Sequence, residues 1–371
     1  MKDFLQKELN ALKEAALIRD PKIIENTDGR IITIDGKEYL NFCSNNYLGL
    51  THHPKVIAAA IEATKKFGAG AGASRLITGT TVLHQQLEKK LAKLKGTEAA
   101  IVFPTGYMAN VGTISALVDE KDTVIIDRLN HASIIDACKL SKAKLQVYPH
   151  KDMKALEKIL QKSGKYQKRL IVTDHVFSMD GDIAPVAEIA KLAEKYDAML
   201  MTDDAHYTGI YEGVGAGIGV GKEKVEVRMG TLSKALGSLG GFVCGSKDLI
   251  DYLRNKARSF IYTTALPPAN CAAAIAAIDL ILETRPKLLK NLEIGHWKTP
   301  IIPIILGSAE KTLEASQKLF DQGIFVSAIR PPTVPKGQAR LRITITAQHT
   351  KEDLKCLASS LQELIPPAEK Q

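Results

Sequence analysis

The sequence predicts an α/β protein with a large domain, built on a mostly parallel, seven-stranded sheet, followed by a smaller α+β domain. Between residues 98 and 245, short apolar runs alternate with segments of helical periodicity, which is the pattern of strands joined by helices. The intervening segments are long enough for helical crossovers, so we expect right-handed βαβ units. The expected strands span residues 98–103, 123–127, 145–149, 169–173, 198–203, 225–230 and 241–245.

The two ends of the chain have different patterns. At the N-terminus, Leu5, Leu9, Leu12 and Ala16 recur at helical spacing among charged residues, which predicts an amphipathic helix. The expected C-terminal elements are a helix at 280–291, a strand at 299–306, a helix at 309–323, strands at 324–329 and 339–345, and a helix at 351–364. The predicted domains are an N-terminal helix and arm (1–45), a large domain (46–280) and a small domain (281–371).

The composition is that of an ordinary globular protein. Of 371 residues, 45% are hydrophobic and 25% are charged. The formal net charge of +9 is spread along the chain, which favours anionic small molecules over nucleic acid as ligands. The five cysteines form no Cys-x-x-Cys pair, which predicts reduced thiols in the cytoplasm. The most apolar stretch, residues 271–282, is too short to span a bilayer, so we expect no membrane partner.

An aspartate and a more distant lysine give the strongest indication of chemistry. The apolar run at 198–202 is typical of a buried parallel strand, and Asp203 would lie at its C-terminal end, where open α/β sheets bind ligands. A carboxylate there can keep a pyridine nitrogen protonated, and the amine of Lys234 can bind an aldehyde covalently. The pair predicts a site for pyridoxal 5'-phosphate. Taken singly, each residue has a commoner explanation, as a helix cap or a surface charge.

Two other patterns carry less weight. The glycine-rich run at 213–222 resembles a nucleotide-binding loop, but its glycine spacing is wrong and Glu223 replaces the magnesium-binding hydroxyl. His52 and His53 have no metal-ligand partner at a suitable spacing, and with Pro54 they indicate the start of a helix. The sequence therefore predicts a loop at the first position, a helix at the second, and no metal site.

Motifs along nearly the whole chain resemble those of the α-oxoamine synthases, a family of pyridoxal phosphate enzymes of fold type I. The segments around Asp203 and Lys234 are among them, and all occur in the family's order. The other matching segments are residues 41–50, 73–76, 176–182 and 330–335. The resemblance implies a homodimer whose active sites lie at the subunit interface.

The resemblance also implies roles for single residues around the cofactor. Lys234 would bind the cofactor aldehyde, Asp203 would contact the pyridine nitrogen, and His131 would stack on the ring. His206, the fourth implied catalytic residue, and Ser178 would contact the ring hydroxyl oxygen. The implied cofactor-binding residues are Thr105, Gly106, Tyr107, His131, Ser178, Asp203, His206, Thr231, Lys234, Thr263 and Thr264. The first three open an expected helix, whose N–H groups suit a phosphate; the last two would come from the neighbouring subunit.

A second implied set of residues binds the substrates. It consists of Arg19, Asn45, His131, Arg330, Thr333 and Arg342. Guanidinium groups suit carboxylates because their fork of donors can pair with both oxygens. The chain departs from the family at His175, Tyr207 and Ala216, where glycine, a small residue and arginine are usual. Residues 291–297 form a shorter segment than in the family, so we expect a trimmed small domain.

The resemblance implies an acyltransferase that condenses L-alanine with pimeloyl-CoA, or with a pimeloyl carrier protein, and releases CO2 in biotin biosynthesis. The alternative within the family is the condensation of glycine with acetyl-CoA to 2-amino-3-ketobutyrate, or another α-oxoamine synthase reaction. A fold-type I aminotransferase would share Asp203 and Lys234. A nucleic-acid-binding protein would rest on the net charge alone, without a recognition motif.

Overall fold

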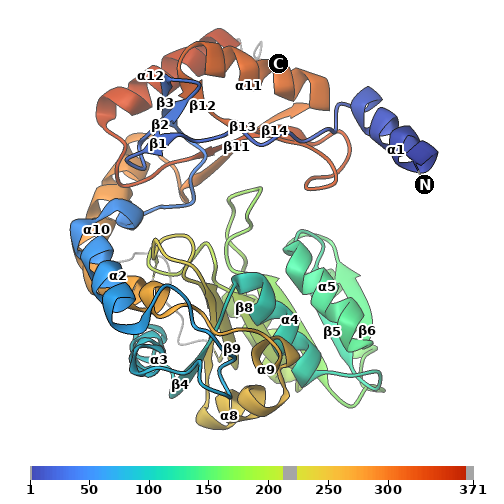
Figure 1. The fold of residues 1–371 in the computed structure, drawn as a ribbon. Coiled ribbons are helices and arrows are strands. Elements are labelled where there is room, and N and C mark those ends of the chain that lie inside the picture. The colour runs from blue at the N-terminus through green and yellow to red at the C-terminus, as the bar shows by residue number, and fades with distance from the viewer. Residues whose placement is uncertain (1, 212–223, 365–371) are drawn as a thin grey trace. The chain divides into compact units, whose positions relative to one another are not determined.

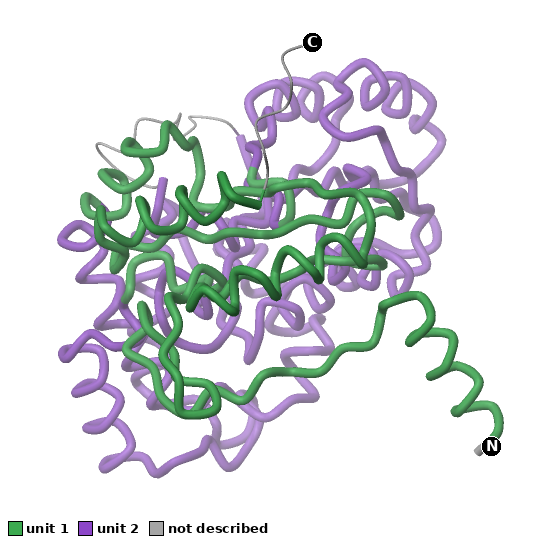
Figure 2. The backbone as a smooth tube through the Cα atoms, turned by 90° about the horizontal axis from the view of Figure 1, so that it is seen from above, with its two compact units in different colours: residues 1–49, 179–181, 286–371 green, residues 50–178, 182–285 purple. Residues whose placement is uncertain are grey.

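The computed structural model describes residues 2–211 and 224–364, and the chain divides into two compact units. Unit 1 comprises residues 1–49, 179–181 and 286–371, and unit 2 comprises residues 50–178 and 182–285 (Figure 2). The sequence-based division treated residues 1–45 as a part of its own, whereas the structure groups them with the C-terminal region. The glycine-rich run at 213–222, with Ala216, lies outside the described residues.

Unit 2 is built on a seven-stranded sheet in the order β4-β10-β9-β8-β7-β5-β6. Figure 1 labels β4, β5, β6, β8 and β9 of this sheet. All neighbouring strands from β9 to β6 are parallel, while β10 is antiparallel to both β4 and β9. The predicted mostly parallel sheet is therefore confirmed. Its strands are β4 (Ala99–Phe103), β5 (Thr123–Asp127), β6 (Lys144–Tyr148), β7 (Arg169–Asp174), β8 (Met199–Asp203), β9 (Val227–Thr231) and β10 (Gly241–Gly245).

Helices pack against both faces of this sheet because successive side chains of a strand point to opposite faces. Val124 and Ile126 of β5 belong to one apolar cluster, with residues of α4 (Gly106–Leu117), α5 (Ala132–Ser141), α8 (Lys247–Lys256) and α9 (Arg258–Ile261). Ile125 belongs to a second cluster, with residues of α6 (Met153–Gln161) and α7 (Val186–Lys195). The remaining helices that begin in unit 2 are η1 (Leu50–His52), α2 (Pro54–Phe67), α3 (Val82–Lys95) and α10 (Pro268–Ile294). As expected, His53 caps the start of α2.

Unit 1 contains two small sheets and has the α+β character that the sequence predicts. In the first sheet, β1 (Asn26–Thr27), β2 (Ile31–Ile34) and β3 (Lys37–Asn41) are antiparallel, and β12 (Ile324–Phe325) adds parallel to β3. The second is antiparallel in the order β11 (Ile301–Gly307), β14 (Ala339–Thr344), β13 (Ser327–Ile329). Unit 1 also contains the helices α11 (Ala309–Asp321) and α12 (Lys351–Leu364). Tyr39 stacks on Phe320 with ring centroids 4.2 Å apart, which joins β3 to α11.

The N-terminal helix α1 (Lys2–Glu14) forms as predicted, and its apolar residues Leu5, Leu9 and Leu12 are exposed. The expectation that Ala16 belongs to this helix is wrong. Ala16 has φ +55°, which a right-handed helix does not allow, so the helix ends before it. Within the described residues, no helix is both long and apolar enough to cross a membrane.

Candidate active site

A cavity of about 200 Å³ lies where β7, β8 and β9 of unit 2 end and α4 begins. It is lined by Gly106, Tyr107, Asn110, His131, Ser133, Asp174, Ser178, Asp203, Ala205, His206, Met229, Thr231 and Lys234. Most of the predicted cofactor-binding residues are therefore brought together. Three of them, Thr105, Thr263 and Thr264, are not in this lining: Thr105 caps α4, Thr263 contacts the sulfur of Met108 at 4.0 Å, and Thr264 pairs with Ser74 in an isolated β-bridge.

Asp203 is the last residue of β8, and its side chain is held by two donors. Oδ1 accepts from the N–H of Ala205 at 3.0 Å, and Oδ2 accepts from Nδ2 of Asn110 at 2.8 Å. Asn110 lies on α4 and is 1% exposed, and sequence reasoning missed it. The available signal was an amide in a mostly apolar helix, because a buried polar side chain requires a partner.

The amide of Asn110 also organises His131 through Ser133. Nδ2 of Asn110 donates to Oγ of Ser133 at 2.8 Å, and the same Oγ lies 2.8 Å from Nδ1 of His131. An amide nitrogen only donates, so the serine hydroxyl accepts from it and directs its own hydrogen to Nδ1. The N–H of Ser133 points at Nδ1 too, at 3.3 Å. Nδ1 is therefore the acceptor, and the neutral ring carries its proton on Nε2.

The surroundings of His131 favour this neutral ring. Loss of solvation lowers its pKa most strongly; the negative charge of Asp203 opposes that shift, and the positive charge of Lys234 adds to it. The net direction is downward, below the ordinary histidine value. At neutral pH, His131 can thus present an N–H at Nε2 without carrying a charge.

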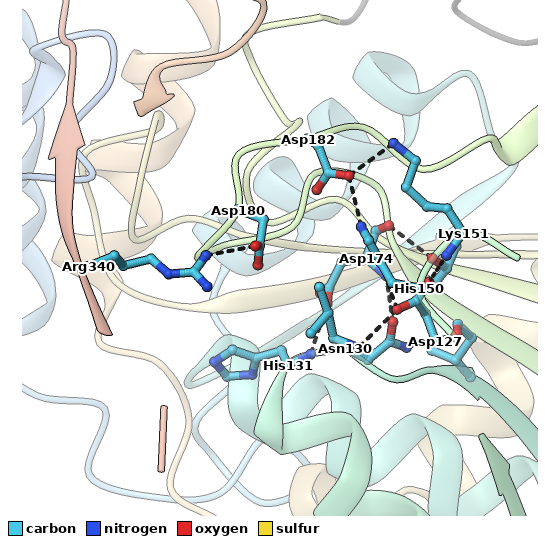
Figure 3. Close-up of polar contacts among 12 residues, drawn as sticks. Asp127, Asn130, His131, His150, Lys151, Asp174, Asp180, Asp182 and Arg340 are labelled. Atoms are coloured by element: carbon cyan, nitrogen blue, oxygen red, sulfur yellow. Dashed lines mark hydrogen bonds and ion pairs between the residues drawn. The ribbon is translucent and has the colours of Figure 1, made fainter. Parts of the chain in front are cut away.

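Asp174 is a second carboxyl group at the cavity that sequence reasoning missed, because the predicted strand stopped one residue short. It ends β7 and is the register partner of Asp203 on β8. Its Oδ2 accepts from the backbone N–H of His131 at 2.8 Å (Figure 3). Burial raises the pKa of Asp174 well above its usual value, and repulsion from Asp203 adds to the rise. The pair therefore favours a protonated Asp174 beside Asp203.

Lys234 lies in the loop that follows β9, and its Nζ is 2.9 Å from Nε2 of His206. Thr231, which ends β9, fixes the start of this loop by donating to the carbonyl of Gly240 at 2.8 Å. The loop turns at Gly237, which has φ +59° and no room for a side chain, since a Cβ there would lie 2.6 Å from the backbone nitrogen of Thr51. The glycine of the lysine motif is thus required by the backbone that presents Lys234.

The start of α4 provides donors for an anion. Thr105 is the N-cap, and its Oγ1 accepts from the N–H of Met108 at 3.1 Å. The first N–H groups of a helix lack partners within the helix, so those of Gly106 and Tyr107 can face a ligand in the cavity. A Cβ on Gly106 would lie 3.2 Å from Cε of Met229, so the wall is close-packed here.

Two of the three departures from the family pattern, His175 and Tyr207, contact each other. The rings of His175 and Tyr207 stack with centroids 3.7 Å apart and an interplanar angle of 10°. Nδ1 of His175 also lies 3.0 Å from Oδ1 of Asp204, whose other oxygen pairs with Nζ of Lys95 at 2.7 Å. The residue after Asp203 is therefore part of a buried polar cluster that includes both departures.

Unit 1 brings two of the predicted substrate-binding residues together. Arg342 of β14 is 5% exposed and donates to Oδ1 of Asn45 at 3.1 Å and to Oγ1 of Thr344 at 2.9 Å. The guanidinium group of Arg342 thus lies against the side-chain oxygens of Asn45 and Thr344. This pair is suited to binding a carboxylate.

The other predicted substrate-binding residues of unit 1 join the N-terminal arm to the loop after β13. Arg330 donates to carbonyls of the arm, including that of Ile18 at 3.2 Å. Arg19 donates to the carbonyl of Pro331 at 3.1 Å, and the N–H of Thr333 donates to the carbonyl of Arg330 at 3.1 Å. In this structure the two guanidinium groups thus bind backbone, and their contact with a substrate stays a prediction.

Comparison with known protein families identifies the chain's relatives. The model of the family "aminotransferase class I and II" matches residues 37–361. An 8-amino-7-oxononanoate synthase of Citrifermentans bemidjiense is 49% identical over 96% of this chain and 97% of the relative. The 8-amino-7-oxononanoate synthase 1 of Bacillus subtilis is 47% identical over 95% of this chain and 94% of the relative.

Solved structures agree with these relatives. A serine palmitoyltransferase from S. paucimobilis with a bound PLP–myriocin aldimine has a TM-score of 0.89 and 34% identity, over 98% of this chain and 96% of that one. An 8-amino-7-oxononanoate synthase from Francisella tularensis has a TM-score of 0.72 and 29% identity, over 88% and 98%. The matches confirm fold type I and extend over nearly the whole chain. The chain therefore belongs to the aminotransferase class I and II family and, within it, to the α-oxoamine synthases, as its motifs predict.

Proposed function

We propose that this chain uses pyridoxal 5'-phosphate to condense L-alanine with a pimeloyl thioester, with release of CO2 and the free thiol, and so forms 8-amino-7-oxononanoate for biotin biosynthesis. The observation that carries the proposal is the meeting of Lys234, Asp203 and His131 in one cavity. Curated relatives with 45–49% identity that are named for this reaction support the choice of substrates.

The residues of the cavity fit the cofactor. Asp203 offers a carboxylate for a protonated pyridine nitrogen, and Asn110 keeps that carboxylate in place. The N–H groups of Gly106 and Tyr107 at the start of α4 suit the phosphate. Lys234 supplies the amine for the aldehyde. Its Nζ is oriented by the contact with Nε2 of His206, 2.9 Å away.

When bound, pyridoxal phosphate supplies an aldehyde for the amino group of the substrate and a ring that withdraws electrons from Cα. The protein's own residues do the rest. Lys234 would take the α-proton of alanine at Nζ, since a neutral amine in a desolvated site is a competent base. Asp203 would hold the proton on the ring nitrogen, and His131 would offer its Nε2 proton to a developing negative charge. Arg342, with Asn45, binds a substrate carboxylate.

We further propose that the active form is a cytoplasmic homodimer in which Thr263 and Thr264 of one subunit complete the site of the other. Neither residue lines the cavity of its own chain, which supports this arrangement. Sedimentation equilibrium tests the dimer. Mixing Lys234→Ala with Thr264→Ala tests the sharing, because mixed dimers would regain one intact site whereas neither variant alone is fully active.

An assay with alanine or glycine against pimeloyl and acetyl thioesters tests the reaction. A distal carboxylate bound by charge-assisted hydrogen bonds, at about 1.5–3 kcal/mol each, should give the pimeloyl donor an advantage on the order of 10- to 100-fold in kcat/KM. A higher kcat/KM with glycine and acetyl-CoA would replace the proposal with the ketobutyrate-forming reaction. Formation of an α-keto acid without thioester consumption would indicate an aminotransferase.

Borohydride reduction followed by peptide mapping tests the cofactor link. Lys234 should carry the label, and Lys234→Ala should lose both the label and the visible absorption of the lysine-bound cofactor. Lys256→Ala, which removes an exposed lysine of α8, is the matched control and should keep both. A label on another lysine in the unaltered protein would overturn the assignment.

A further inference from the structure

Two loops at the cavity carry predicted cofactor contacts, and one histidine lies between them. Residues 128–131 join β5 to α5 and carry His131; we refer to them as the His131 loop. Residues 175–183 follow β7 and carry Ser178; we refer to them as the Ser178 loop. His150 follows β6, the edge strand that pairs with β5.

Both ring nitrogens of His150 are hydrogen-bonded to carboxylates (Figure 3). Nδ1 lies 3.0 Å from Oδ1 of Asp127, which ends β5 and also accepts from the N–H of Leu129 at 2.9 Å in the His131 loop. Nε2 lies 2.8 Å from Oδ2 of Asp182 in the Ser178 loop. The backbone carbonyl of Asp182 accepts from the N–H of Phe177 at 3.0 Å, and the imidazole meets the Phe177 ring edge-on at 4.4 Å. A single ring therefore contacts the Ser178 loop directly and the His131 loop through the carboxylate of Asp127.

The geometry requires a charged ring. Carboxylates only accept hydrogen bonds and a neutral imidazole has one N–H, so donation to both oxygens needs the imidazolium. The charged groups around the ring are Asp127, Asp182 and Lys151, whose Nζ lies 2.9 Å from Oδ2 of Asp182. Burial opposes the charge, but the hydrogen bonds and attraction to the two carboxylates outweigh it and raise the pKa of His150 to about 9.

We propose that the imidazolium of His150 is a positioning residue that couples the His131 loop to the Ser178 loop and so holds both cofactor contacts in place. This inference rests on the proposed function in one respect: the ligand that the two loops contact is taken to be pyridoxal phosphate. Below pH 9 both N–H groups donate and the loops are joined. Above it one N–H remains, one carboxylate faces a lone pair, and the coupling is lost.

Three variants separate the two halves of the bridge. In His150→Asn the amide occupies the place of Nδ1, so it can reach Asp127 but is too short for Asp182. In His150→Gln the amide reaches the place of Nε2 and can bind Asp182 instead. Lys151→Gln is the matched control, because it removes the other cation on Asp182 and leaves the imidazole in place.

Hydrogen exchange measured on the cofactor-free protein reads the coupling directly. In His150→Asn, the Ser178 loop should exchange about tenfold faster, the loss expected for one charge-assisted hydrogen bond, while the His131 loop keeps its protection. His150→Gln should give the reverse. Lys151→Gln should change either loop by less than about twofold, since it breaks a more exposed ion pair. The dissociation constant for pyridoxal phosphate should rise about tenfold in His150→Asn and stay near its original value in Lys151→Gln.

A pH profile distinguishes positioning from a general loss of stability. In the unaltered protein, exchange of the Ser178 loop, corrected for the intrinsic pH dependence, should rise between pH 8 and pH 10, and this rise should be absent in His150→Asn. Unchanged protection and unchanged cofactor affinity in His150→Asn would overturn the proposal.

If the variants fail to fold, 15N NMR of the histidines in the unaltered protein decides the question. Two protonated ring nitrogens on His150 at pH 7.5 support the bridge, and one overturns it. Because exchange and NMR need no substrate, failure of the alanine and pimeloyl assay would leave this result standing. Absence of the coupling in an unaltered protein that is active in this assay would refute only the bridge.

Discussion

At the scale of single residues, the side-chain amide of Asn110 supports the site by donating two hydrogen bonds. It donates to Asp203 and to Ser133, each at 2.8 Å. The opposite orientation of the amide would place its oxygen against a carboxylate oxygen, which is repulsive, so the direction of the whole chain of bonds from Asp203 to His131 is determined. One buried amide thus orients the carboxylate and selects the tautomer of the imidazole.

We predict that Asn110→Ala weakens cofactor binding. The bond from Asn110 to the charged Asp203 is worth about 1.5–3 kcal/mol, so the dissociation constant of pyridoxal phosphate should rise about 10- to 100-fold. Fluorescence titration of the cofactor-free protein measures it, and 15N NMR should show that His131 no longer holds its proton on Nε2 alone. Ser115→Ala is the control, because Ser115 lies on the same helix and bonds only within it. Unaltered affinity and an unaltered tautomer would refute the role of Asn110.

At the scale of elements, a buried ion pair joins α3 to the end of β8. The side chains of Lys95 and Asp204 are 2% and 1% exposed and their charged atoms are 2.7 Å apart. Burial by itself would raise the pKa of Asp204, but Lys95 and His175 outweigh it and hold the pKa below the ordinary value. Lys95 also lies 5.8 Å from the ring of Tyr207. The neighbours of Asp203 are therefore fixed by a helix that contributes no residue to the cavity lining.

We predict that Lys95→Met destabilises the protein by about 3–5 kcal/mol, because it leaves a buried carboxylate without its cation. The free energy of unfolding in urea measures this effect. Lys93→Met, an exposed position on the same helix, should cost less than about 1 kcal/mol. The depressed pKa of Asp204 means that the pair stabilises the fold above the unfolded carboxyl value near pH 4, and that this contribution is lost as the pH falls further. Equal effects of the two substitutions would contradict the assignment.

At the scale of the whole molecule, each unit contains a buried histidine whose ring accepts a hydrogen bond from a backbone N–H. In unit 2, His84 accepts from the N–H of Thr81 and its Nε2 is 2.9 Å from the carbonyl of Leu266. In unit 1, His349 accepts from the N–H of Thr346 and its Nε2 is 3.1 Å from the carbonyl of Asn41. Burial lowers the pKa of each to about 4. A proton added to either ring would point at a backbone N–H.

We predict that acid lowers the free energy of unfolding of both units because these two rings become protonated. A histidine with a folded pKa near 4 and an unfolded value near 6.5 stabilises the fold fully above pH 6.5, and this stability is lost as the pH falls from 6.5 towards 4. Between pH 7.5 and pH 5.0 each should cost about 2 kcal/mol of unfolding free energy.

Urea unfolding of His349→Gln and His84→Gln at the two pH values tests this prediction. Trp297, the single tryptophan of the chain, lies in unit 1 and reports on His349 by fluorescence, while circular dichroism follows the whole chain. Each variant should show a smaller loss between the two pH values than the unaltered protein. His296→Asn is the control and should show the full loss; the same pH dependence in all variants would exclude the two buried rings as its source.

The sequence by itself determined the elements and the central pair of the site. Alternating apolar residues define strands locally, and the segments at 123–127, 241–245 and 351–364 have the predicted bounds. In a parallel sheet, the residue at the C-terminal end of a buried strand lies at the edge where ligands bind, which is why Asp203 could be placed from its neighbours in the chain. The family motifs then placed Lys234 and most of the cavity lining.

The tertiary structure alone decided which side chains support that pair. Strand order placed Asp174 beside Asp203, although the two are 29 positions apart in the sequence. Packing of α4 placed Asn110 against both Asp203 and Ser133. The same holds for His150, whose two carboxylate partners come from the end of β5 and from the Ser178 loop. These contacts depend on the pairing of distant segments and on the direction of hydrogen bonds, and neither leaves a local periodicity in the sequence.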